Sequence, residues 1–114
     1  MDSILQLARE AGRIADSKKA EDITILDLRN ITTLTDSFVI CSVTNNRQAR
    51  AIAQEIDEKL TKLGLKIDHI EGYPNSNWIL MDYTDLVIHI FTKDIREYYD
   101  LEHLWGDAPR VELD

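Results

Sequence analysis

The sequence predicts an α+β fold, with a single mixed β-sheet of about five strands flanked by helices. Three observations support this. Apolar residues recur at helical spacing in two segments, they alternate in two strands between residues 78 and 91, and they make up most of the run at 38–43. The second helical segment separates the run at 38–43 from the strand expected after it, which favours one mixed sheet. A length of 114 residues suits one domain spanning residues 1–114.

Two amphipathic helices are expected. Ser3 is placed to cap the first, and Lys18 and Lys19 follow its end, where cations interact favourably with the helix dipole. The apolar stripe of this helix consists of Ile4, Leu7, Ala8, Ala11, Ile14 and Ala15. Asn45 or Asn46 can cap the second helix, which Gly64 ends. Its stripe consists of Ala49, Ile52, Ala53, Ile56, Leu60 and Leu63.

Residues 22–28 have strand composition and lead into a polar loop. The run at 38–43 is apolar on both faces, which is typical of a central strand covered on both sides. Residues 65–70 are predicted to form a third strand, and residues 71–75 a loop.

Residues 78–91 predict a hairpin around Thr84 and Asp85. A two-residue connection would pair apolar residues across the strands: Tyr83 with Leu86, Met81 with Ile88, and Ile79 with Ile90. The other face would carry Trp78, Leu80, Asp82, Val87, His89 and Phe91. Thr-Asp is not a favoured sequence for a tight turn. The apolar pattern nevertheless predicts one core face and one apolar surface that holds a carboxylate and an imidazole.

The C-terminal third continues with a short helix, for which Asp94 and Glu97 resemble a capping box. This helix would bring Tyr98 and Tyr99 close together, followed by Leu101, Leu104 and Trp105. Five tyrosines and tryptophans gather in this part of the chain: Trp78, Tyr83, Tyr98, Tyr99 and Trp105. Tyrosine and tryptophan are enriched in interface hot spots, although they also fill cores.

The formal net charge of −8 argues against direct binding to the phosphate backbone of a nucleic acid, so little direct RNA contact is expected. A basic protein would suit this charge better. Cys41 is the only cysteine and lies in an apolar run, which excludes an intrachain disulfide and favours a cytoplasmic location. No apolar run is long enough to predict a membrane span.

No catalytic, metal or cofactor site is predicted. His69, His89 and His103 do not lie in a metal-binding spacing, no glycine-rich phosphate loop exists, and Cys41 is expected to be buried and inert. Asp85 falls in the turn, where aspartates commonly bond their own backbone. Asp82 needs solvent or a partner, which is either His89 on the adjacent strand or a basic side chain from another protein.

One combination of motifs resembles a known family. The matching residues run in order through TDSFVICS at 35–42, Arg47-Gln48, Glu71-Gly72, Trp78, LMDY at 80–83, Asp85, Val87, His89, Phe91, REYYDLE at 96–102 and Leu104-Trp105. Together they resemble the bacterial ribosomal silencing factor (Iojap-like) family over most of the chain. Residues 43–46 depart from it, because relatives tend to have a glycine and small residues there.

The resemblance implies a nucleotidyltransferase-like fold without the catalytic residues. It also implies a translational repressor that binds the large ribosomal subunit through ribosomal protein fourteen, blocks joining of the small subunit, and acts when nutrients are scarce. We predict partner contacts by Trp78, Leu80, Met81, Asp82, Tyr83, His89, Tyr98, Tyr99 and Glu102. Two alternatives stay open. One is an enzyme on that scaffold, which only Asp82 and Asp85 support, and the other is a homodimeric adaptor for another protein.

Overall fold

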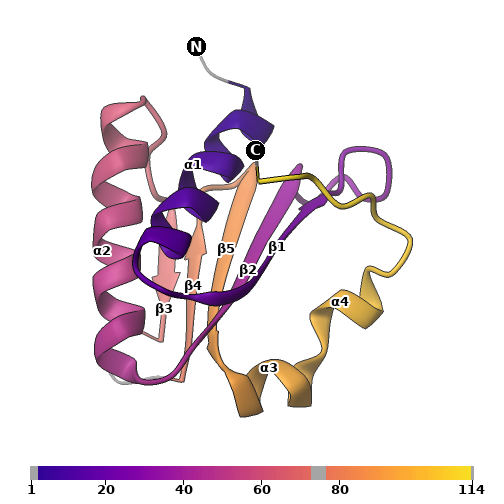
Figure 1. Ribbon diagram of the computed structural model, residues 1–114. Coiled ribbons are helices and arrows are strands. Elements are labelled where there is room, and N and C mark those ends of the chain that lie inside the picture. Colours follow the sequence, from indigo (N-terminus) through magenta and orange to yellow (C-terminus); the bar gives the residue numbers. More distant parts are fainter. Residues whose placement is uncertain (1–2, 73–76, 114) are drawn as a thin grey trace.

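The computed structural model describes residues 3–72 and 77–113. Its elements are α1 (Ile4–Ser17), β1 (Glu21–Asp27), β2 (Ser37–Val43), α2 (Asn46–Lys62), β3 (His69–Glu71), β4 (Trp78–Asp82), β5 (Leu86–Thr92), α3 (Lys93–Tyr99) and α4 (Leu101–Leu104). The strands form one sheet in the order β1-β2-β5-β4-β3. Helices α1 and α2 cover one face, and α3 and α4 lie on the opposite side (Figure 1). The predicted mixed α+β sheet is confirmed.

Side-chain caps set the start of the two long helices. Ser3 Oγ accepts a hydrogen bond from the Gln6 backbone N–H, and Gln6 Oε1 accepts one from the Ser3 backbone N–H, so Ser3 forms a full capping box. Asn45, rather than Asn46, caps α2 by accepting from the Gln48 N–H at 2.8 Å. Both predicted stripes pack onto the sheet. Their alanines at positions 8, 11, 15, 49 and 53 are buried and allow close helix packing.

The sheet is mixed because β2 and β5 run parallel, whereas the other neighbouring strands run antiparallel. The β4–β5 register is the predicted one: Ile79 pairs with Ile90, Met81 with Ile88, and Trp78 with Phe91. Cys41 lies in the central strand β2 and is fully buried, as predicted.

The hairpin turn forms although its sequence is unfavourable, and one of its residues adopts a strained backbone conformation. Thr84 has φ of 73°, a region that β-branched residues rarely adopt, and the Asp85 N–H donates to the Tyr83 carbonyl at 2.9 Å. The Asp82 carboxylate accepts from the Thr84 N–H at 2.7 Å. This side-chain bond to the turn comes from Asp82, the last residue of β4.

The third predicted strand is shorter than expected. Only His69–Glu71 pairs with β4, because β4 ends at Asp82 and offers no backbone partner to residues 65–67. Leu65 and Ile67 instead pack, half-buried, against the core on the α2 side. Of the predicted loop at 71–75, Glu71 belongs to β3, and residues 73–75 lie outside the described residues.

The C-terminal helix also differs from the prediction. Thr92, rather than Asp94, is the N-cap of α3, and the Thr92 hydroxyl donates to the Asp94 carboxylate at 2.7 Å. Asp100 then adopts a left-handed conformation (φ 44°, ψ 54°) that ends α3 and separates it from α4. A short polar side chain such as Asp tolerates this conformation better than most. The expected single helix is consequently two short ones with a change of direction between them.

Candidate functional site

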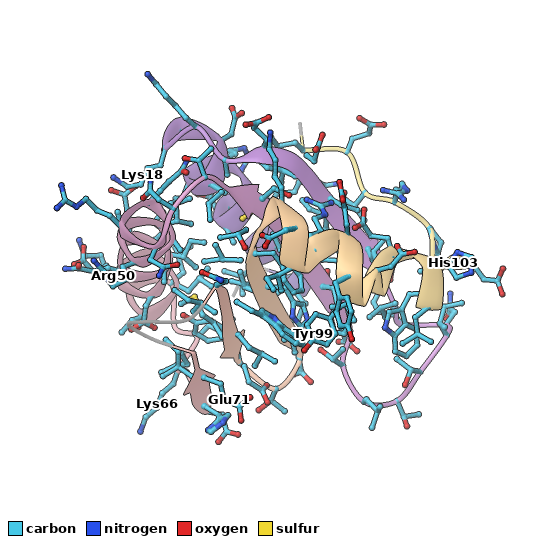
Figure 2. All side chains as sticks on the ribbon, turned by 90° about the horizontal axis from the view of Figure 1, so that it is seen from below. Lys18, Arg50, Lys66, Glu71, Tyr99 and His103 are labelled. Carbon is cyan, nitrogen blue, oxygen red and sulfur yellow. The ribbon has the colours of Figure 1, made fainter. Side chains whose placement is uncertain are left out.

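Seven aromatic side chains of the described residues, with His89 counted among them, form a continuous series across the sheet face next to α3 and α4. The ring-centroid distances are 5.9 Å for Trp105–Phe38, 4.7 Å for Phe38–His89, 5.8 Å for His89–Phe91, 4.9 Å for Phe91–Trp78, 4.7 Å for Trp78–Tyr99 and 5.1 Å for Tyr99–Tyr98. The series begins in a packed core cluster and ends in solvent, where Tyr99 is 49% and Tyr98 81% exposed. Figure 2 shows Tyr99 between Glu71 on β3 and His103 on α4. The buried rings restrict the motion of the exposed tyrosines that pack on them. The tyrosines therefore lose less side-chain entropy when a partner binds.

His89 is held as a neutral imidazole. Its side chain is 4% exposed, and burial lowers its pKa to about 4. Nδ1 accepts a hydrogen bond from the Trp78 indole N–H at 3.2 Å, so the ring proton must sit on Nε2. His89 Nε2–H is therefore a buried hydrogen-bond donor.

Asp82 does not pair with His89, since its carboxylate bonds the turn at Thr84. The internal-pair explanation for Asp82 was therefore wrong. Its surroundings are acidic: the neighbouring His69 pairs with Glu71 at 3.0 Å, and this bond, together with the charges of Asp82 and Asp68, raises the pKa of His69. No lysine or arginine of the described ranges lies within ion-pair distance of Asp82 or Asp68.

A groove of about 390 Å³ opens beside this acidic pair. Its wall residues come from the β1–β2 loop, strands β2, β4 and β5, the segment before β3, and the C-terminal segment: Thr32, Leu34, Thr35, Phe38, Asp68, Leu80, Asp82, Thr84, Val87, His89 and Trp105. Leu34 is 79% exposed at this groove. The sequence argument missed Leu34, Thr35 and Asp68. The available signal was the pair of apolar residues, Ile31 and Leu34, inside a loop that is otherwise polar.

The predicted contact residues divide into three groups. Tyr98 and Tyr99 are exposed, while Trp78, Leu80, Asp82 and Glu102 are half-buried. His89 is buried in the wall of the groove. Met81 and Tyr83 are buried on the α1/α2 side of the sheet. The prediction that these two residues contact a partner directly was therefore wrong. The Tyr83 hydroxyl donates to Asp57 at 2.7 Å, which ties the end of β4 to α2, and burial raises the pKa of Tyr83.

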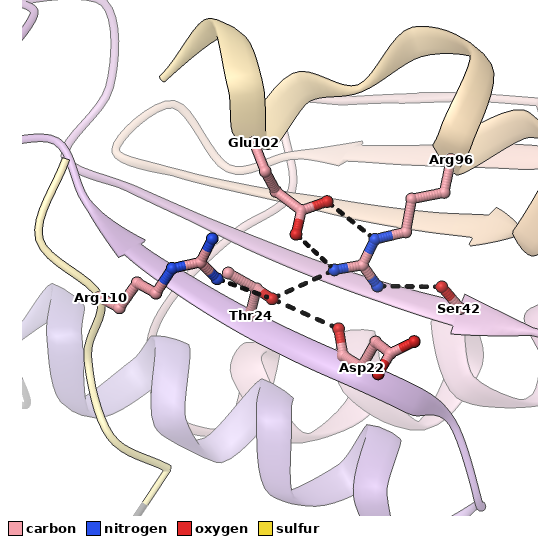
Figure 3. Close-up of polar contacts among 6 residues, drawn as sticks. All are labelled: Asp22, Thr24, Ser42, Arg96, Glu102 and Arg110. Carbon is pink, nitrogen blue, oxygen red and sulfur yellow. Dashed lines mark hydrogen bonds and ion pairs between the residues drawn. The ribbon is translucent and has the colours of Figure 1, made fainter. Parts of the chain in front are cut away.

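Glu102 is engaged inside the molecule, in a network that sequence reasoning missed (Figure 3). It forms a two-pronged ion pair with Arg96, with Nε–Oε1 and Nη2–Oε2 distances of 2.9 Å. Arg96 also donates to Ser42 Oγ at 2.9 Å and to Thr24 Oγ1 at 3.1 Å. The Arg96 hydrogen bond holds the pKa of Glu102 below its usual range. The network joins α3 and α4 to strands β1 and β2 and thereby fixes the support of the two tyrosines.

Groups able to hold a metal are absent from the described parts of the chain, judged by clusters of three or more His, Cys, Asp or Glu side chains. Burial raises the pKa of the Cys41 thiol to about 12, which keeps it protonated and unreactive at neutral pH. None of the helices in the described ranges is long and apolar enough to cross a membrane.

The fold and this face define a small α+β protein with an open surface of aromatic and acidic side chains. The family model described as "Ribosomal silencing factor during starvation" matches residues 1–114. The chain is 44% identical over 112 residues to the ribosomal silencing factor RsfS of Bacillus subtilis, which covers 98% of this chain and 92% of that protein. It is 34% identical over 109 residues to the chloroplast protein Iojap of Zea mays, which covers 96% of this chain and 47% of that protein.

A crystal structure of a Chromobacterium violaceum protein superposes with a TM-score of 0.87 at 32% identity, covering 92% of this chain and 88% of that one. The chain belongs to the ribosomal silencing factor family. Its role is thus related to the ribosome, and the family names describe a regulatory factor rather than an enzyme.

Proposed function

We propose that this protein represses translation in the cytoplasm by binding the large ribosomal subunit through ribosomal protein fourteen and sterically blocking the small subunit. The surface offered to that partner comprises Trp78, Leu80, Asp82, Tyr98 and Tyr99, which we name the docking face. Silencing during nutrient limitation would follow from this block, and no catalysis is needed for it.

The observation that carries the proposal is the exposure of two adjacent tyrosines, one of which packs on the aromatic ring of Trp78. Tyr98 is 81% exposed, so its ring is accessible to a partner. Tyrosine is a preferred anchor in protein interfaces. The net charge of −8 supports a basic protein partner and disfavours ribosomal RNA as the main contact.

The enzyme alternative gains no observation in its favour. Its two candidate carboxylates differ in role, because Asp82 bonds the hairpin turn and Asp85 is exposed in it. The homodimer alternative uses the same apolar surface, and it is an outcome that the experiment below can reveal.

The test is a subunit-joining experiment. Purified large subunits are incubated with the protein before small subunits are added, and joined ribosomes are separated from free subunits on a sucrose gradient. The proposal expects fewer joined ribosomes as the protein concentration rises, with the protein in the large-subunit fraction. Joined ribosomes at an unchanged level, with the protein left at the top of the gradient as a dimer, would instead support the adaptor.

A further inference from the structure

The net charge of −8 is distributed unevenly between the two sides of the sheet. The layer of α1 and α2, residues 3–20 and 45–67, contains nine lysines and arginines but only five aspartates and glutamates. The rest of the chain contains four basic and sixteen acidic residues. The helical layer is therefore net positive, although the protein as a whole is acidic. A positive surface suits a polyanion.

Part of this positive charge gathers where α1 ends and α2 begins. The residues there, which we name the basic cluster, are Lys18, Lys19, Arg47 and Arg50. Gln48 Nε2 donates to the Lys18 carbonyl at 3.0 Å and so joins the two helix ends. Lys18 pairs with Glu55 at 3.6 Å. Lys19 and Arg47 are exposed, and neither has a carboxylate within ion-pair distance in residues 3–72 and 77–113.

The sheet topology places the basic cluster at the same end of the molecule as the exposed tyrosines. The parallel strands β2 and β5 end together, with Val43 opposite Thr92. Helix α2 begins shortly after Val43, and α3 begins directly after Thr92. Figure 2, which shows the molecule from below, places Lys18 and Arg50 on the α2 side of the sheet and Tyr99 on the other side. A large partner that covers the tyrosines therefore extends close to the basic cluster.

The charge of the cluster restricts what it can contact. Lysine and arginine side chains would repel a basic protein and attract phosphate groups. Ribosomal proteins are held on ribosomal RNA, so phosphate groups border any ribosomal protein on the subunit surface. Contacts with phosphate position a protein without reading a base sequence. Exposed cations on two neighbouring helix ends are sufficient for such a contact.

We propose that the basic cluster binds the phosphate backbone of large-subunit ribosomal RNA, next to the ribosomal protein that the docking face meets. The inference rests on the proposed function, because it takes the large subunit as the binding partner. It adds a second contact of opposite charge on the other side of the sheet. Two contacts of opposite charge fix the orientation in which the protein blocks the small subunit.

The test is the double variant Lys19→Gln/Arg47→Gln. Glutamine keeps a long polar side chain and removes the charge, and both positions are exposed, so the fold should be retained. Affinity for purified large subunits is measured by cosedimentation over a salt series. Each lost phosphate contact reduces the slope of log affinity against log salt by about 0.7–0.9. The double variant should therefore lose about 1.5 of that slope and bind about tenfold more weakly at low salt.

The matched control is Lys59→Gln/Lys62→Gln, which removes the same charge from exposed positions on the same helix. Lys62 lies about 22 Å from Arg47 along α2 at 1.5 Å per residue. The control should bind large subunits with the affinity and salt dependence of wild type. Both double variants should bind isolated ribosomal protein fourteen like wild type, because the basic cluster contacts RNA and not that protein.

The outcomes separate this inference from the proposed function. If wild type cosediments and Lys19→Gln/Arg47→Gln matches it in affinity and salt slope, the cluster does not contact RNA, although the proposed function stands. Equal losses in both double variants would assign the effect to overall charge and overturn the inference. Weaker binding of Lys19→Gln/Arg47→Gln to the isolated ribosomal protein would overturn it as well, because the cluster would then contact protein. If wild type does not cosediment, both fail.

Discussion

Replacing Glu102 with alanine should destabilise the protein by about 3 kcal/mol, because it leaves the Arg96 guanidinium buried without its counter-ion. The change removes two charge-assisted hydrogen bonds of 2.9 Å, each worth roughly 1.5–3 kcal/mol. Breaking a buried ion pair from one side typically costs about 3–5 kcal/mol. We place the expected loss near the lower end because Arg96 retains Ser42 and Thr24 as acceptors.

The assay is equilibrium unfolding in urea at neutral pH, with Glu97→Ala as the control. Glu97 lies on the same helical segment and borders the same cavity as Arg96, but it is exposed. The control should change the unfolding free energy by less than about 0.5 kcal/mol. A Glu102→Ala loss below about 1 kcal/mol would refute the view that this pair holds α3 and α4 in place.

The same pair gives a pH signature. The pKa of Glu102 is lower in the folded state than in the unfolded chain, so its contribution is fully present above the unfolded value and is lost as the pH falls through the folded value. Wild type should therefore lose part of its stability in mildly to strongly acidic solution. In Glu102→Ala this part of the acid dependence should be missing.

Three further predictions concern single residues. Cys41→Ser should cost about 1–3 kcal/mol, because a hydroxyl replaces a fully buried thiol, and native Cys41 should react slowly with thiol reagents; rapid labelling of folded protein would contradict this. His89 has a folded pKa of about 4 against 6.5 in the unfolded chain, so the unfolded state takes up the proton first and stability should fall by about 3 kcal/mol between pH 7 and pH 4. A His89→Phe variant whose stability falls as steeply over that range would argue against the assignment. Asp82→Lys should impair large-subunit binding more than Asp82→Ala, because it places a cation before a basic partner, and equal losses would remove the charge argument.

Local patterns predicted the helices, the strand pairing and the core face of the hairpin. The apolar alternation at 78–91 admits only one register that keeps Met81 and Ile88 in the core, so the pairing was determined even though the turn sequence was unfavourable. In the same way, the apolar run around Cys41 required a strand covered on both faces.

What could not be predicted depends on contacts between distant segments. Arg96 reaches Thr24, 72 positions away in the sequence, and no local pattern encodes such a pair. The groove likewise combines the β1–β2 loop with β4, β5 and Trp105. The break at Asp100 was missed because an isolated aspartate in a helical pattern gives little warning of a left-handed residue. Met81 and Tyr83 were included as contacts through the resemblance, against their own position on the core face.

The most direct test of the docking face is cosedimentation of Tyr98→Ala with purified large subunits at increasing protein concentration. Tyr98 is largely exposed, so the variant should keep the native circular dichroism spectrum. We expect its affinity to fall about thirtyfold, as for the loss of an interface anchor, while Lys62→Ala, on the exposed side of α2, binds like wild type. A folded Tyr98→Ala protein that sediments with large subunits at wild-type affinity would contradict the assignment of this face.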